Sequence, residues 1–249
     1  MEPIIEVKNL VKVFHSRGRK ITAVNDVSFD VFKGEIFGMI GPNGAGKSTT
    51  FSMLTTLIKP TSGSIRVAGF DVDKQDDKIR PLIGIVPQKL SLYPLLTARE
   101  NLELMGNLYN VPKTDMEVKI DYYLKLVGLE ASADRYTGGF SGGMKQRLSV
   151  IAAVLHDPQI LFWDEPSTGL DPQTRNVIWK LARKFNEEGK TLVFTTHYME
   201  EADNLCDRVA VMDSGKMVAL DNPERLKETT VSTNLEEVFV HFTGEEVRD

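Results

Sequence analysis

Four short apolar runs along the chain each lead into a polar or glycine-rich segment. The runs, each given with the residue that it leads into, are residues 36–40 and Gly41, 83–86 and Gln88, 160–163 and Asp164, and 192–194 and Thr195. Continuous apolar strands are typical of a parallel sheet that is covered on both faces. Ligands of open α/β sheets lie just beyond the carboxyl ends of such strands. The pattern therefore predicts that the polar segments meet at one edge of a mostly parallel central sheet.

Other periodicities flank this pattern. Residues 4–14 and 21–32 are rich in Ile, Val and Phe with partial alternation, which predicts two strands of an N-terminal antiparallel β subdomain. Thr97 and Glu100 form a capping-box pattern that opens a helix through about Tyr109. Residues 116–127 and 144–155 also predict helices, the second with an apolar face. We expect an α/β fold with an inserted α-helical subdomain.

Composition and charge narrow the possible functions. Of the 249 residues 41% are hydrophobic, which is enough for a sizeable core, and the net charge of -5 argues against a nucleic-acid surface. The single cysteine, Cys206, excludes an internal disulfide, fits a reducing compartment, and is expected to be a small buried side chain. We see no signal-peptide pattern at the start, and the apolar run 148–155 is far shorter than the ~20 residues that span a bilayer. Membranes are therefore expected to matter only through a partner.

A phosphate-binding loop follows the first of the four strands. Gly41-Pro42-Asn43-Gly44-Ala45-Gly46-Lys47-Ser48 matches the G-x-x-x-x-G-K-[ST] pattern and precedes a predicted helix. Backbone N–H groups and the helix N-terminus favour phosphate at such a loop. Lys47 is expected to reach the β- and γ-phosphates, Ser48 to bind Mg²⁺, and Thr49 to complete the nucleotide site.

Two acidic residues follow the third strand. A carboxylate at Asp164 can hold Mg²⁺ directly or through water. Glu165 is placed to orient or deprotonate the attacking water. ATP with Mg²⁺ is therefore the expected ligand, and hydrolysis the expected reaction.

Phe140-Ser141-Gly142-Gly143-Met144-Lys145-Gln146 narrows the class of ATPase. It resembles the L-S-G-G-Q signature of ABC ATPases and lies ahead of the acidic pair at the spacing typical of that family. Ser141 is a good N-cap for the following helix, and Gly142 and Gly143 let a phosphate approach the backbone. Phe140 and Met144 depart from the usual leucine and glutamine, and the change at Met144 removes a polar side chain near this second anion site.

The resemblance implies roles for further residues. Phe14, in place of a more usual tyrosine, is similar to the aromatic residue that stacks on adenine. Gln88 is similar to the glutamine that senses Mg²⁺ and the attacking water. Residues 167–171, ending at Asp171, resemble the loop that communicates between subunits, and His197 resembles the switch histidine at the γ-phosphate. In this family two subunits pair head-to-tail, so that the signature of one closes over ATP held by the other.

The resemblance also implies a domain plan and partners. We expect a single ABC ATPase domain over residues 1–249, in which a P-loop NTPase (RecA-like) core with the β subdomain comprises 1–90 and 156–230. The helical signature subdomain comprises 91–155, and the C-terminal tail 231–249. A homodimer or paired ATPase subunit, a transmembrane permease subunit and a location at the cytoplasmic face of the membrane are implied. The tail resembles that of exporter subunits; an importer ATPase and a soluble ABC ATPase of DNA repair or translation are the alternatives.

Two further expectations concern surfaces. The apolar stretch 88–101 is expected to contact the membrane partner, the alternative being that its side chains pack inside the helical insert. His15, His156 and His241 lack a partner pattern and are expected to be surface histidines.

Overall fold

A six-stranded sheet in the order β10-β9-β3-β8-β7-β6 forms the centre of the computed structural model, which describes residues 2–16 and 19–244. Its parallel strands are β3 (Ile36–Ile40), β6 (Ile83–Val86), β7 (Ile160–Asp164), β8 (Thr191–Thr196) and β9 (Arg208–Asp213), and β10 (Lys216–Asp221) is antiparallel. Successive side chains of a strand point to opposite faces. Leu161 and Trp163 accordingly enter one buried cluster, whereas Ile160 and Phe162 enter another. The four apolar runs are strands of this sheet, as the sequence predicts.

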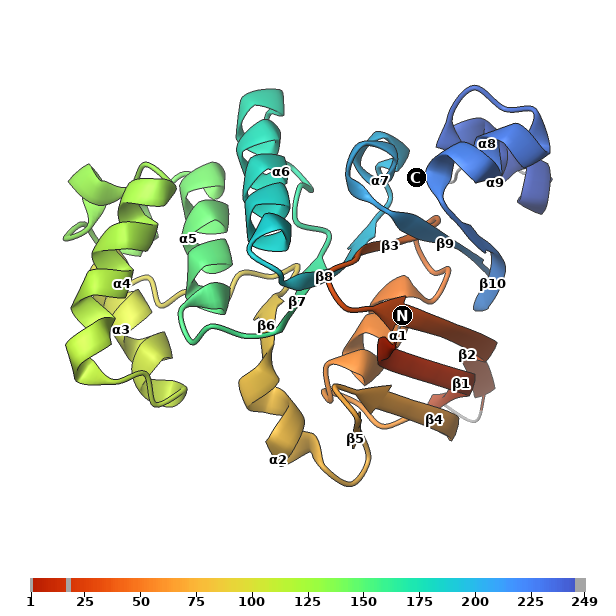
Figure 1. Ribbon diagram of the computed structural model, residues 1–249, viewed down its shortest axis with the longest axis horizontal. Helices are drawn as coiled ribbons and strands as arrows, with labels where there is room; N and C mark the ends of the chain where they lie inside the picture. Colours follow the sequence, from red (N-terminus) through yellow and green to blue (C-terminus); the bar gives the residue numbers. More distant parts are fainter. Residues whose placement is uncertain (1, 17–18, 245–249) are drawn as a thin grey trace.

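A second, antiparallel sheet has the order β2-β1-β4-β5. Its strands are β1 (Pro3–Ser16), β2 (Arg19–Phe32), β4 (Ser62–Val67) and β5 (Phe70–Asp71). Helix α1 (Lys47–Leu54) lies against β2 of this sheet and against β7 and β8 of the other, so it is packed between them. Figure 1 shows this sheet at the lower right, beside α1. The predicted N-terminal antiparallel subdomain is confirmed.

Helices α3 (Ala98–Leu108), α4 (Lys113–Leu126) and α5 (Gly142–Val154) gather on the opposite side of the molecule, at the left of Figure 1. The capping box at Thr97 and Glu100 is present with both of its hydrogen bonds, and the Ser141 hydroxyl caps α5. Short helical segments connect these parts: α2 (Asp76–Ile79), η1 (Arg80–Leu82), η2 (Glu130–Ser132) and η3 (Thr137–Gly139). The three helices expected between residues 90 and 155 are confirmed.

The remaining helices cover the central sheet and follow its last strand. They are α6 (Pro172–Glu187), α7 (Met199–Leu205), α8 (Pro223–Thr230) and α9 (Leu235–Thr243). Leu235, Val238 and Phe239 of α9 are buried in the same cluster as the α7 side chains. Within the described residues, we find no helix with the length and apolar character that a membrane span requires.

His156 does not lie free on the surface, and the expectation for it was wrong. Its ring stacks on Tyr109 at a centroid distance of 3.7 Å, and its Nε2 lies 3.0 Å from the carbonyl oxygen of Ile83. Burial lowers the pKa of His156. The ring therefore packs between the end of α3 and the start of β6. His15 and His241 are exposed, and Cys206 is buried, as expected.

Candidate functional site

The phosphate loop, which connects β3 to α1, lines a pocket of about 400 Å³. Its lining residues are Ile21, Thr22, Ala23, Pro42, Asn43, Gly44, Gly46, Lys47, Ser48, Thr49, Gln88 and Glu165. The loop, the segment after β6 and the segment after β7 thus meet at one place. This is the convergence of strand ends that the apolar runs predict.

Three glycines give the loop its shape. Gly41, Gly44 and Gly46 have φ angles of +146°, +84° and +100°, which disfavour residues with a Cβ. A Cβ on Gly41 would lie 2.1 Å from the carbonyl oxygen of Met212, so the backbone approaches β9 too closely for a side chain. A Cβ on Gly44 would meet nothing within 4 Å, so only its backbone conformation requires glycine. Successive N–H groups in such loops form a concave anion site.

Lys47 is the cation of this site and is buried. Its Nζ donates to the carbonyl oxygens of Gly41 at 2.7 Å and Pro42 at 3.1 Å. It also lies 4.0 Å from Oε1 of Glu165. Burial lowers the pKa of Lys47, and the nearby carboxylates of Glu165 and Asp164 oppose that change. The ammonium group is therefore held at the loop, where phosphate oxygens can replace its carbonyl partners.

Asp164, at the end of β7, lies beside Ser48 of the loop. Its Oδ1 accepts hydrogen bonds from Thr195 Oγ1 at 2.5 Å and from Ser48 Oγ at 3.4 Å. Burial raises the pKa of Asp164, the hydrogen bond from Thr195 lowers it, and the neighbouring Glu165 raises it. The oxygens of Asp164, Ser48 and Thr195 thus form a cluster, and the hydrogen bonds compensate the negative charge of Asp164 only partly. A cation beside Ser48 and Asp164 would complete the compensation.

Glu165 is held in a left-handed backbone conformation, with φ of +49°. Its N–H donates both to the carbonyl oxygen of Thr195 and to the Thr195 hydroxyl, each at 3.1 Å. Non-glycine residues in this region of φ cost energy and persist where the surroundings impose them, often at functional sites. Thr195 thus supports both acids.

Several polar side chains converge on the Glu165 carboxylate. Oε2 accepts hydrogen bonds from Gln88 Nε2 and Thr168 Oγ1, each at 3.1 Å. His197 Nδ1 lies 3.3 Å from the same oxygen without hydrogen-bonding alignment. The predicted residues Gln88, Glu165 and His197 are therefore brought together. Thr168 and Thr195 were missed as site residues, although both stand in the polar segments that follow the apolar runs.

Phe14 lies on β1, and the lining of the pocket does not include it. Its ring is 40% exposed and has Lys12 Nζ at 5.1 Å from its centroid. Its cross-strand partner Ile21 does line the pocket, together with Thr22 and Ala23 of β2. The sequence analysis did not predict these β2 residues as part of the site. The pairing of residue 14 with residue 21 in the hairpin could have indicated them.

The signature lies apart from the phosphate pocket. Ser141 Oγ accepts a hydrogen bond from Met144 N at 3.2 Å, and a Cβ on Gly142 would meet nothing within 4 Å. Gly143 lies against Thr174, since a Cβ on it would stand 2.8 Å from Cγ2 of that residue. Met144 packs against the core. Neither the signature nor Asp171, the N-cap of α6, lines the phosphate pocket of its own chain.

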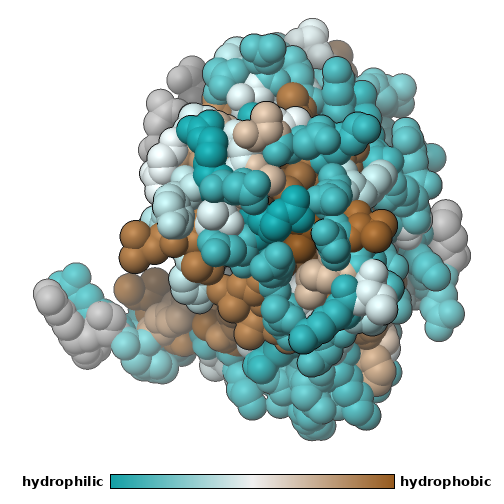
Figure 2. Space-filling model, turned by 90° about the vertical axis from the view of Figure 1, so that its left-hand side faces the viewer, coloured by the Kyte–Doolittle hydropathy of each residue, from teal (hydrophilic) through white to brown (hydrophobic). Residues whose placement is uncertain are grey.

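Buried polar side chains hold the backbone of the loop before α3 by hydrogen bonds, while two side chains of this loop are exposed. Asn101 Oδ1 accepts from Tyr93 N at 2.8 Å, and the Thr137 hydroxyl donates to the Tyr93 carbonyl oxygen at 2.8 Å. Leu92 packs partly against the core, whereas Tyr93 is 55% and Leu95 85% exposed. Leu92 thus packs inside the molecule, which was the alternative to a partner contact, whereas Tyr93 and Leu95 do not. Figure 2 shows the helical side of the molecule, where apolar surface gathers just below the middle and toward the left, with hydrophilic surface above and below it.

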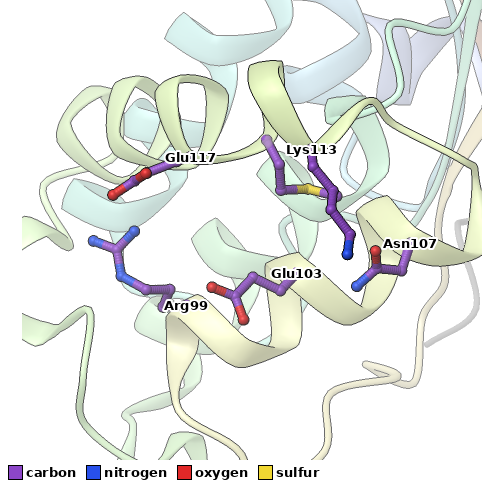
Figure 3. A pocket seen from close by; sticks show the side chains of 6 residues that line it. Arg99, Glu103, Asn107, Lys113 and Glu117 are labelled. Carbon is purple, nitrogen blue, oxygen red and sulfur yellow. The ribbon is translucent and has the colours of Figure 1, made fainter.

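Another pocket, of about 420 Å³, lies between α3 and α4 (Figure 3). It is lined by Arg99, Glu103, Asn107, Lys113, Met116 and Glu117. The charges are mixed, and the Arg99 guanidinium already donates to Asp121 at 2.8 Å. This pocket lacks the loop and the acids found beside Lys47, so it does not compete as the site of chemistry.

Comparison with known proteins agrees with this geometry. The family model described as "ABC transporter" matches residues 24–168. The linearmycin resistance ATP-binding protein LnrL of Bacillus subtilis (strain 168) is 44% identical over 87% of this chain and 68% of its own length. The Nod factor export ATP-binding protein I of Bradyrhizobium diazoefficiens is 42% identical over 93% of this chain and 75% of its own length.

Solved structures agree as well. One described as an ATP-binding subunit of an ABC transporter has a TM-score of 0.87 at 28% identity, covering 96% of this chain and 99% of its own. A dimeric post-hydrolysis state of the ATP-binding cassette MJ0796, bound to ADP and Pi, has a TM-score of 0.81 at 32% identity, covering 88% of this chain and 98% of its own. With its phosphate loop, acidic pair and signature in place, the chain belongs to the ABC transporter family and is an ATP-binding and ATP-hydrolysing domain of that family.

Proposed function

We propose that this ATPase powers export by a separate transmembrane partner, and that it does so by dimerising when ATP binds. The observation that carries the proposal is the separation of two anion sites within one chain. The phosphate loop lines a pocket with Glu165, whereas the capped N-terminus of α5 lies elsewhere. A second subunit in head-to-tail orientation would bring the missing site to each pocket. The dimeric state of MJ0796 supports this arrangement.

The residues around the pocket have separate tasks in this proposal. Lys47 and the N–H groups of the phosphate loop bind the phosphates of ATP, and their fixed positions favour the charge that develops during transfer. Glu165 orients the attacking water and accepts its proton. Gln88 and Thr168 hold the Glu165 carboxylate by hydrogen bonds, and His197 lies beside it, where it would contact the γ-phosphate. Ile21, which lines the pocket, and its cross-strand neighbour Phe14 would offer apolar surface to the base.

The donors beside Ser48 suit a magnesium ion. Hydroxyl and carboxylate oxygens are what Mg²⁺ takes from proteins, usually one or two of them with phosphates supplying others. Burial raises the pKa of Asp164, which is the change that a bound cation would reverse. Mg²⁺ held by Ser48 and Asp164, with Gln88 nearby, would neutralise charge on the phosphates.

Export is favoured over the alternatives by the relatives. One is named for resistance to linearmycin and another for export of Nod factor. An importer ATPase would share the same catalytic site. None of the relatives reported above is named for DNA repair or translation.

The partner surface of this proposal is the loop before α3. Tyr93 and Leu95 have exposed side chains, and the buried Asn101 and Thr137 hold the backbone of the loop at Tyr93 and Leu96. Contiguous exposed apolar surface marks interaction sites, and these two side chains lie two residues apart on one loop. The subunit would then be peripheral, at the cytoplasmic face of the membrane, and attached through a permease.

We also propose that the chain forms one ATPase domain over residues 1–249. Residues 1–90 and 156–230 would form the RecA-like core with the β subdomain, and residues 91–155 the helical signature subdomain. Residues 231–249 would be a tail, of which 245–249 lie outside the described residues. The buried cluster that runs from α3 to α9, and helix α1 packed between the antiparallel and the central sheet, support a single domain.

We call the phosphate loop of one subunit, closed by the signature of the other, the composite site. Mixing two inactive variants tests whether it exists. Lys47→Ala damages the phosphate loop, and Gly142→Asp places a carboxylate at the signature without a clash, because that position has free space. Each homodimer then has two damaged sites. In the mixed dimer, one site takes its loop from the Gly142→Asp subunit and its signature from the Lys47→Ala subunit, so it is intact. We expect ATP occlusion in one site per mixed dimer, measured by retention of radiolabelled ATP.

The outcome separates two arrangements. If loop and signature served one nucleotide within one chain, every site in the mixture would carry a lesion and occlusion would stay absent. Mixed dimers must be shown to form by affinity tags of two kinds. Formation without occlusion would refute head-to-tail pairing.

Charged substitutions test the partner surface. Leu95→Glu or Tyr93→Glu should abolish the ATP-driven transport that the reconstituted membrane partner carries out. Binding of ATP to the isolated subunit should stay intact. Leu108→Glu is the matched control, since Leu108 is also exposed but lies at the far end of α3. Equal transport by all variants would place the partner elsewhere, and transport into the compartment that holds the ATPase would identify an importer.

A further inference from the structure

Glu201 on α7 is a buried acid that the proposed mechanism does not use. Its side chain is 1% exposed, and its Oε1 accepts hydrogen bonds from Ser167 Oγ and from Trp179 Nε1, the latter at 2.9 Å. Oε2 has no hydrogen-bond partner among the described residues. Burial raises the pKa of Glu201, and Ser167, Thr196, Trp179 and Arg175 oppose that change in this order.

The partners of Glu201 belong to segments that carry the catalytic side chains. Ser167 lies in the loop between β7 and α6 and is itself 1% exposed. The next residue, Thr168, donates to Glu165 Oε2 at 3.1 Å. The Ser167 carbonyl oxygen accepts from Leu170 N at 3.2 Å, just before Asp171. Anchoring Ser167 therefore holds the backbone on both sides of this loop.

The same acid also anchors the segment that carries His197. Glu201 is in the first turn of α7, which begins two residues after His197. Its own N–H donates to the Tyr198 carbonyl oxygen at 3.1 Å, and Tyr198 N donates to the Thr196 hydroxyl at 3.0 Å. Nothing in packing demands a carboxylate here, because an apolar side chain of similar size would fill the space without the cost of burying an acid. What a carboxylate adds is one atom that accepts from two separate elements.

We propose that Glu201 is a positioning residue for ATP hydrolysis: through Ser167 and α7 it sets the placement of Glu165 relative to His197. The inference rests on the proposed role of Glu165 as the group that activates water. Small displacements of a reacting group lower turnover strongly, whereas binding of ATP at the phosphate loop does not depend on them. The predicted kinetic effect of losing Glu201 is thus a lower kcat with little change in KM for ATP.

The test compares Glu201→Ala, Glu201→Gln and Ser167→Ala in the full-length protein. Glu201→Ala removes the shared acceptor and should lower kcat about 10- to 100-fold, with KM for ATP near its wild-type value. Glu201→Gln keeps an acceptor oxygen of the same reach and should restore most of kcat. Ser167→Ala cuts only the link to the catalytic loop, leaves the bond to Trp179, and should lower kcat in the same direction with a smaller loss of Tm.

Controls keep the result interpretable. Glu200→Ala changes the adjacent, exposed acid and should leave kcat and KM unchanged. If Glu201→Ala does not fold, Ser167→Ala and Glu201→Gln still decide, because wild-type kcat in Ser167→Ala would overturn the proposal. So would a rise in KM at unchanged kcat. Glu165→Gln, assayed alongside, separates the failures: an active Glu165→Gln enzyme refutes the proposed role of Glu165, whereas an inactive one with normal Ser167→Ala refutes only the role of Glu201.

Discussion

Replacing Glu165 by glutamine removes the proposed acceptor of the water proton while keeping the shape of the side chain. In the structure Oε2 accepts from Gln88 and Thr168, both of which are donors. The amide oxygen of the variant can take that position, which leaves its NH₂ group at the Oε1 position, 4.0 Å from Lys47 Nζ in the native protein. Two hydrogen bonds are thereby retained, and we expect the variant to fold.

The magnitude follows from the chemistry that is lost. General-base catalysis contributes about 10²- to 10⁴-fold. At 1.36 kcal/mol for each factor of ten, that is roughly 3–5 kcal/mol of barrier. The substitution also removes the attraction between Glu165 and Lys47. That attraction is present in the protein without ATP, so we do not expect its loss to weaken the affinity for ATP. Removing the carboxylate also removes the first of the two charges that hold up the pKa of Lys47, so that pKa should fall further.

The assay measures steady-state phosphate release and, separately, the affinity for a fluorescent ATP analogue. We expect turnover to fall to the background rate, affinity to be preserved, and an ATP-bound dimer to accumulate on size-exclusion chromatography. Glu200→Gln, which changes an exposed glutamate of α7, is the control. Turnover close to that of the control would refute the assignment of Glu165 as the base.

Three other predictions concern stability and selectivity. Lys190 lowers the pKa of Asp157 by a hydrogen bond, so the stabilisation is present above the unfolded value of 3.8 and is lost as pH falls through the lower folded value. Urea unfolding of Asp157→Asn at pH values from 7 to below 3.8 should therefore show a smaller acid loss than wild type. Gly84→Ala should destabilise by about 1–3 kcal/mol, since its Cβ would lie 2.1 Å from a carbonyl oxygen, whereas Gly139→Ala, in free space, should be nearly neutral in thermal unfolding. GTP should compete with ATP within about one order of magnitude, because stacking on Phe14 uses a π-face common to all bases; a thousandfold preference in competition binding would refute this.

Local pattern was sufficient to predict the strand before the phosphate loop and the starts of two helices in the helical insert. The strand before Gly41, the hydroxyl cap at Ser141 and the capping box at Thr97 each depend on residues only a few positions apart. Hydrogen bonds and propensities of that range can be inferred from spacing alone. The convergence of strand ends was also predictable, because parallel strands of one sheet present their carboxyl ends at one edge.

Partners from distant segments could not be inferred in the same way. Thr195 supports Asp164 and Glu165 only because β8 lies beside β7, with residue 195 in register with residue 164. Glu201 follows another glutamate in a helical turn, and only tertiary packing buries one and exposes the other. His156 was misread for this reason, since Tyr109 reaches it from α3.

The contact between Gly143 and Thr174 links the signature to the loop that ends at Asp171 within one chain. Thr174 N and Oγ1 both donate to the Asp171 carboxylate, at 2.9 and 2.6 Å, so the residue against which the signature packs is also the residue that holds the N-cap of α6. A side chain at position 143 would stand 2.8 Å from Thr174 Cγ2 and would push on that cap, whereas position 142 opens to free space. A lesion at Gly143 would therefore disturb the signature and Asp171 together, and loss of function there would not say which had failed. Gly142→Asp changes the signature alone, which is why the pairing experiment must use it.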